Sequence, residues 1–134
     1  MGDVKRKHDL ERPAVADDAQ ALRERDAQDR LLAQGGDQIE PRPWRPAAMP
    51  PSAVDLTQYA LWRSSDLGLD GVSSALTLLR AARAELESVE VALLFVARSE
   101  GMTWAQIAEA MGFRSPQACQ QYVNRLSARQ EKQP

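Results

Sequence analysis

The sequence is poor in the residue types that build covalent and metal-bound sites. Its 134 residues include one cysteine, Cys119, and one histidine, His8. A single cysteine excludes a disulfide within the chain. Cys119 and His8 form neither a catalytic cysteine–histidine arrangement nor a pattern with the spacing of metal ligands. No glycine-rich phosphate loop and no nucleophile elbow occurs. We therefore predict that the protein is not an enzyme and has no catalytic residues, metal or cofactor.

Long apolar runs are also missing. The longest, residues 91–97, is far too short to span a bilayer. The basic residues 5–8 are not followed by an apolar segment, so the pattern of a secretory signal is absent. These observations predict a cytoplasmic protein without membrane contact.

Acidic residues are absent between Glu109 and Glu131, although the whole chain has a net charge of −2. Residues 110–134 hold four basic residues and one acidic residue, whereas residues 13–40 hold seven acidic residues and three arginines. A DNA duplex repels carboxylates and attracts arginine and lysine. The C-terminal end is therefore suited to DNA, while the overall acidity counts against tight non-specific binding.

Two helix starts follow one another closely in this C-terminal end. Thr103 and Gln106 have the spacing of a capping box, which predicts a helix over residues 104–111. Gly112 can adopt the positive φ angle that ends a helix. Ser115 is a favourable N-cap for the next helix, with proline at its first position.

The second helix has two different faces. Its inward face recurs at helical spacing, and we interpret Cys119 within it as a small buried hydrophobe rather than a redox sensor. That face consists of Cys119, Tyr122, Val123 and Leu126. The opposite face is a row of amides, consisting of Gln117, Gln120, Gln121 and Asn124. Amide side chains can pair bidentately with adenine in the major groove; the alternative is a solvated polar face that is rich in glutamine.

Residues 101–112, Gly-Met-Thr-Trp-Ala-Gln-Ile-Ala-Glu-Ala-Met-Gly, resemble the first helix and turn of bacterial helix-turn-helix proteins. The likeness is greatest to the DNA-recognising C-terminal region of sigma factors and to small actinobacterial-type regulators. In these families a run like Thr-Trp-x-x-Ile-Ala-x-x-x-Gly precedes a serine-capped recognition helix. The turn 112–115 is one residue longer than the common sigma-type turn. The side chains that reach bases are therefore expected to differ by one position from those of the sigma factors.

The resemblance, which covers about 40 of the 134 residues, implies that residues 116–129 are the recognition helix. It implies contacts from the amide row to bases. The residues expected near phosphates are Thr103, Trp104, Arg114, Ser115, Arg125 and Arg129. For Trp104 a second interpretation is a core or rim aromatic, because it shares a helix face with Ala108 and Met111.

The N-terminal third is predicted to be disordered. Residues 1–53 contain few large apolar side chains, so they bury too little surface to offset the entropy of ordering. Within this third, the pattern of residues 17–34 predicts a helix that is only marginally stable by itself. Residues 41–51 are rich in proline and predict an extended linker. Trp44 is interpreted as part of a spacer, with docking on a partner as the alternative.

Residues 54–130 predict an all-α domain, a long helix followed by a helix-turn-helix, with residues 131–134 as a tail. We expect a short helix over 55–63 with aromatics packed on the next helix, a loop over 66–71 and a long helix over 74–99. The long helix has an apolar stripe that consists of Leu76, Leu79, Leu86, Val89, Leu93 and Val96. Its glutamates, Glu85, Glu87, Glu90 and Glu100, are interpreted as solvated charges.

Part of the long helix needs a cover, which either residues 55–63 or a second copy would supply. One recognition helix reads only a few base pairs, and helix-turn-helix proteins commonly dimerise over half-sites about 34 Å apart. We therefore expect a homodimer through residues 74–99.

Together these patterns predict a sequence-specific protein that binds double-stranded DNA, regulates transcription and associates with the nucleoid when bound. The alternative is a protein-interaction adaptor on a helix-turn-helix frame, which binds RNA polymerase, a sigma factor or another regulator. Residues 13–51 would then contact the protein partner.

Overall fold

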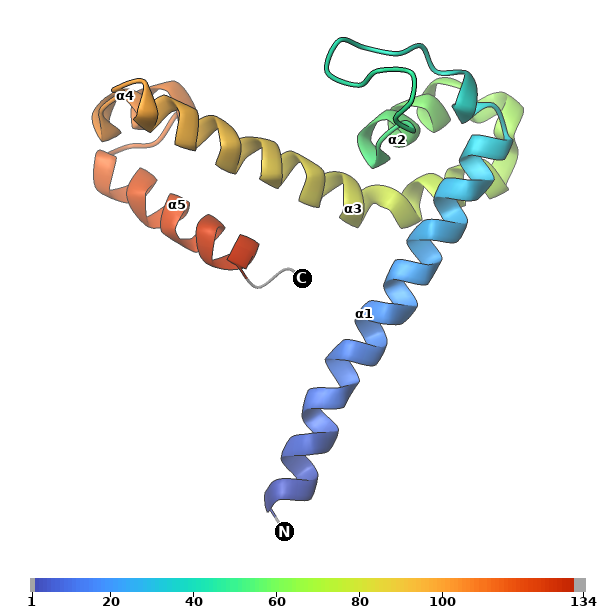
Figure 1. Ribbon diagram of the computed structural model, residues 1–134, viewed down its shortest axis with the longest axis horizontal. Coiled ribbons are helices and arrows are strands. Elements are labelled where there is room, and N and C mark those ends of the chain that lie inside the picture. Colours follow the sequence, from blue (N-terminus) through green and yellow to red (C-terminus); the bar gives the residue numbers. More distant parts are fainter. Residues whose placement is uncertain (1, 132–134) are drawn as a thin grey trace. The chain divides into compact units, whose positions relative to one another are not determined.

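The computed structural model describes residues 2–131, and the side chains of residues 18–131. The side chains of the basic residues 5–8, and all of the predicted tail beyond Glu131, lie outside this description. The described chain is all-helical, as predicted. Its elements are α1 (Gly2–Ala33), the 3-10 turn η1 (Gly36–Gln38), α2 (Ala53–Trp62), α3 (Ser64–Ser99), α4 (Trp104–Met111) and α5 (Pro116–Glu131) (Figure 1). None of the described helices is long and apolar enough to cross a membrane.

The chain forms two compact units, Met1–Arg83 and Ala84–Pro134, and α3 contributes residues to both. The sequence predicted a boundary at residue 53 instead. The predicted boundary is too early because side chains of α1 belong to the core of the first unit.

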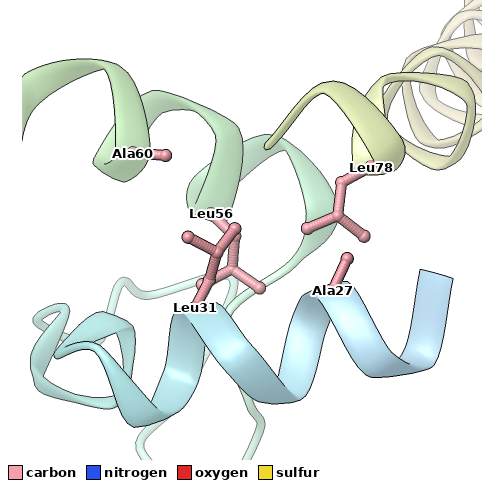
Figure 2. Packing of buried hydrophobic residues seen from close by; sticks show 5 residues of the cluster. All are labelled: Ala27, Leu31, Leu56, Ala60 and Leu78. Carbon is pink, nitrogen blue, oxygen red and sulfur yellow. The ribbon is translucent and has the colours of Figure 1, made fainter. Parts of the chain in front are cut away.

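The first unit is built around a small apolar cluster drawn from α1, α2 and α3. Its members are Ala27, Leu31, Leu56, Ala60 and Leu78 (Figure 2). Leu31 and Leu56 are completely buried. Disorder was therefore the wrong prediction for residues 18–33. The leucine content of α1 is low, but burial of Leu31 against α2 stabilises a helix that is marginal alone.

The connection after α1 is held close to this core. Gly35 has a φ of 109°, which turns the chain at the end of the helix. A Cβ atom on Gly36 would lie 2.7 Å from a methyl carbon of Leu56 and 2.8 Å from the carbonyl oxygen of Leu31. The phenol of Tyr59 donates a 2.8 Å hydrogen bond to the carbonyl of Gln34. Glycine at residue 36 is thus required for the close approach of η1 to the core.

Residues 41–51 form a folded connection rather than the predicted extended linker. Arg42 and Arg45 exchange backbone hydrogen bonds of 2.9 and 2.8 Å, which close a tight turn over residues 42–45. The Arg45 side chain is buried, and its Nε lies 3.0 Å from Oδ2 of Asp55. It also donates a 2.6 Å hydrogen bond to the carbonyl of Glu40. This single arginine therefore anchors the connection to the start of α2.

α2 begins two residues earlier than predicted. Ser52 and Asp55 form a capping box, in which the amide of Ser52 donates to Asp55 over 3.0 Å and the amide of Asp55 donates to Ser52 over 3.2 Å. Its aromatics do not pack as expected, since Tyr59 contacts the end of α1 and Trp62 is 77% exposed.

α3 starts at Ser64, ten residues before the predicted start. The expected loop over residues 66–71 is reduced to a break at Gly68, where φ is 66° and ψ is −164°. This conformation is essentially restricted to glycine. Leu78 on α3 is covered by α1 and α2, whereas Leu76 remains 64% exposed.

Candidate nucleic-acid interface

α4 has the predicted caps at both ends. The Thr103 hydroxyl accepts a 3.1 Å hydrogen bond from the amide of Gln106, whose side-chain oxygen accepts one of 2.8 Å from the amide of Thr103. At the other end Gly112 has a φ of 81°, and the amide of Phe113 donates to the carbonyl of Ala108 over 2.8 Å. These local bonds fix where α4 ends and where the chain reverses.

α5 begins as predicted at Pro116. The Ser115 hydroxyl accepts a 3.1 Å hydrogen bond from the amide of Ala118. Its inward face closes a second core, of which Leu94, Ile107, Ala108, Cys119 and Leu126 are the buried members. Cys119 is completely buried, which agrees with a packing role, and burial raises the pKa of its thiol.

The outward face of α5 brings together the predicted base-facing residues. All four are exposed, and so is the flanking Arg125. The members of this amide face are Gln117, Gln120, Gln121 and Asn124. No carboxylate occurs on α5 before Glu131. The arrangement presents several hydrogen-bond donors and acceptors from one rigid helix, with positive charge beside them.

The residues predicted near phosphates fall into different environments. Arg114 is exposed, whereas the hydroxyls of Thr103 and Ser115 serve as helix caps. Trp104 is half-buried against the second core, and the guanidinium carbon of Arg98 lies 5.0 Å from its ring centroid. Trp104 is therefore a rim aromatic, the second of the two interpretations.

Arg98 was not selected from the sequence. It also donates a 2.9 Å hydrogen bond to the carbonyl of Met102, just before α4. The sequence feature that could have indicated this role is the position of Arg98 on the last turn of α3, six residues before Trp104. The side chain links the end of α3 to the start of α4 and is exposed on that side of the unit.

α5 is tied to α3 by polar contacts. Arg129 Nη2 lies 2.9 Å from Glu87 Oε1, and the Ser88 hydroxyl donates to Gln130 over 3.4 Å. The phenol of Tyr122 donates to the carboxylate of Glu90. The interpretation of Glu87 and Glu90 as solvated charges was wrong, because both carboxylates have partners on α5. Arg129 is accordingly less available to a phosphate than Arg114 or Arg125.

The hydrogen bond to Glu90 raises the pKa of Tyr122 above its ordinary value of 10.0, with burial and the nearby negative charge acting in the same direction. The neutral phenol is thus favoured in the folded state. Its contribution to stability is complete below pH 10 and is lost as the pH rises through the folded-state pKa.

We expect the stability of the second unit to fall at alkaline pH, from about pH 9 because of Cys119 and further above pH 10 because of Tyr122. Denaturant titrations of the wild type and of Tyr122→Phe between pH 8 and about 11 measure this. The variant should be less stable at neutral pH but should lose less stability on going to high pH. An equal loss in both proteins would contradict the role of this hydrogen bond.

Among the described residues there is no group of three or more histidine, cysteine, aspartate or glutamate side chains arranged to hold a metal ion. Comparisons with protein-family models, with curated proteins and with solved structures found no match to this chain.

Proposed function

We propose that α4, the turn 112–115 and α5 act as a helix-turn-helix, and that the protein binds specific sequences of double-stranded DNA to regulate transcription. The observation that carries the proposal is the amide face of α5, which is exposed and free of carboxylates. In this proposal α5 enters the major groove, and its amides read base edges.

The charge around α5 supports this assignment. Arg114 precedes the helix and Arg125 flanks the amide face, and both are exposed. Exposed arginines at the border of a recognition helix are suited to phosphates, which fix the register of the helix without reading sequence. Arg98 is a third candidate for such a contact, since it is exposed next to the start of α4.

The contacts of Arg129 limit the region that reads DNA. Because Arg129 pairs with Glu87, the last turn of α5 lies beside a carboxylate of α3. A duplex would avoid this acid, so the proposed reading surface is confined to residues 117–125 of α5. This length fits a helix that reads only a few base pairs.

Selection of binding sites from random duplex DNA tests the proposal. The full chain is used at about 150 mM salt, where non-specific phosphate contacts are weakened. We expect enrichment of a short motif with adenines at positions read by the amides. Weak binding without enrichment, together with a strong dependence on salt, would rule out sequence recognition by α5.

A second candidate function, a protein-interaction adaptor that binds RNA polymerase, a sigma factor or another regulator, is favoured by the turn at residues 42–45. Trp44 lies in this turn and is 79% exposed, while the neighbouring Arg45 is buried and paired. An exposed tryptophan on an ordered turn is the kind of residue that dominates binding energy in protein interfaces. In this alternative, Trp44→Ala would abolish partner binding, and glutamates at residues 120 and 121 would leave it unchanged.

A further inference from the structure

One stretch of α3 is apolar on all sides. From Val91 to Ala97 every side chain is apolar, but only Leu94 is buried, while Val91 and Ala97 are partly buried against the second core. Leu93 and Val96 remain 64% and 52% exposed. Helices that are apolar all round are ordinarily buried. Among the described residues this side of α3 is therefore an apolar face without a cover.

The exposed side chains form a continuous seam. Leu86, Val89, Leu93 and Val96 follow the 3-4-3 spacing of heptad a and d positions, and each is at least half exposed. The predicted stripe thus exists within this unit, but it faces away from the core. Beside it lies an apolar groove of about 510 Å³, which Met111 of α4 helps to line. The seam and the groove together offer room for a helix.

We propose that the occupant is α3 of a second copy of this chain, packed antiparallel across a two-fold axis near Val91. The 3-4-3 spacing is unchanged when it is read in reverse. Leu86 then faces the partner's Val96, and Val89 faces the partner's Leu93. Each layer pairs a leucine with a valine, which is the combination of large and smaller side chains that packs evenly.

The lack of charge in the centre of the seam also favours self-association. α3 carries no charged side chain between Glu90 and Arg98, the stretch that contains Leu93 and Val96. Glu90 lines the groove, but its carboxylate accepts a hydrogen bond from Tyr122. The centre of the seam thus offers no charge to an oppositely charged partner, whereas a second uncharged seam matches it.

The proposed dimer rests on the proposed function in one respect: it supplies the second recognition helix that a two-part DNA site requires. The seam covers only about three turns of helix, so the interface is at the small end of those known. We therefore expect a dissociation constant on the order of micromolar in free solution. Two half-sites on one duplex would strengthen the dimer, because binding of the first subunit raises the local concentration of the second.

Sedimentation of the full chain over a range of concentrations tests the oligomeric state. Leu93→Gln should weaken the dimer at least 10-fold, at a cost of about 1.4 kcal/mol or more. Leu69→Gln is the matched control, because Leu69 is on the same helix and is 88% exposed but lies in the first unit, outside the seam. Circular dichroism checks that both variants keep their helices. A wild type that stays monomeric at several hundred micromolar, or equal effects of the two variants, would overturn the proposal.

Disulfide trapping tests the antiparallel arrangement. A mixture of Val89→Cys and Leu93→Cys proteins should form a mixed disulfide on mild oxidation, while each protein alone should not. Cys119 is completely buried, and the wild type serves as the control for its reactivity. Efficient trapping of Leu93→Cys with itself would indicate a parallel pair and overturn the arrangement.

The two proposals fail in distinguishable ways. A monomer that selects a single short motif from random DNA would overturn the dimer and leave DNA recognition in place. A dimer that selects no motif would support the interface and overturn the proposed function.

Discussion

Replacement of Leu31 by alanine is expected to lower the free energy of unfolding of the first unit by about 3 kcal/mol. Leu31 is completely buried and contacts the core formed by α2 and α3 (Figure 2). Its truncation removes apolar contacts and leaves a cavity that the surrounding helices fill only partly. A loss of this size is a large fraction of the stability of a small unit.

Urea titration followed by tryptophan fluorescence measures this effect, since Trp44 and Trp62 both lie in the first unit. Leu22→Ala is the matched control, because Leu22 is on the same helix but is 56% exposed. It should change the free energy of unfolding by less than about 0.5 kcal/mol. Equal, small effects of both substitutions would mean that α1 does not contribute to the core in solution.

Glutamate at both residue 117 and residue 121 is expected to reduce specific DNA binding at least about 100-fold. The double variant Gln117→Glu, Gln121→Glu loses two amide contacts, each worth roughly 1–3 kcal/mol of discrimination. It also places two carboxylates on the surface proposed to face the duplex. Fluorescence anisotropy with the selected DNA measures the change in affinity.

The control for this variant is Gln38→Glu, Gln58→Glu, which makes the same change in net charge at two exposed glutamines of the first unit. We expect its affinity to stay within about 3-fold of the wild type, because these charges are not placed against the duplex. A similar loss of affinity in both double variants would indicate a general charge effect and would remove the argument for reading by α5.

The local features of α4 and α5 could be predicted from the sequence because they depend on neighbouring residues. The capping box of Thr103 and Gln106, the positive φ of Gly112 and the serine cap of α5 each form within one turn of helix. The exposed amide face followed from helical spacing alone. The capping box of Ser52 and Asp55 has the same kind of local pattern but was not predicted, because the spacing of the apolar residues by itself places the start of α2 two residues later.

The inner face of α3 in the second unit could not be predicted from apolar periodicity alone. The spacing of Leu86, Val89, Leu93 and Val96 predicted an apolar face on the long helix. The structure packs Leu94 and Val91 against α4 and α5 and leaves the predicted face exposed. A helix that is apolar all round has several possible inner faces, and only the positions of its neighbours select one.

The sequence by itself determined the helical class, both ends of α4, the start of α5 and the polar character of the outward face of α5, because short-range hydrogen bonds and helical spacing fix these features. Only the tertiary structure decided that α1 belongs to a core, that Arg45 anchors the connection before α2, and that Arg129 pairs with Glu87. Leu31 meets Leu56 across 25 residues, and Glu87 meets Arg129 across 42. Contacts over such separations depend on which helices come together, a choice made by the total burial of the fold rather than by any one stretch of the chain.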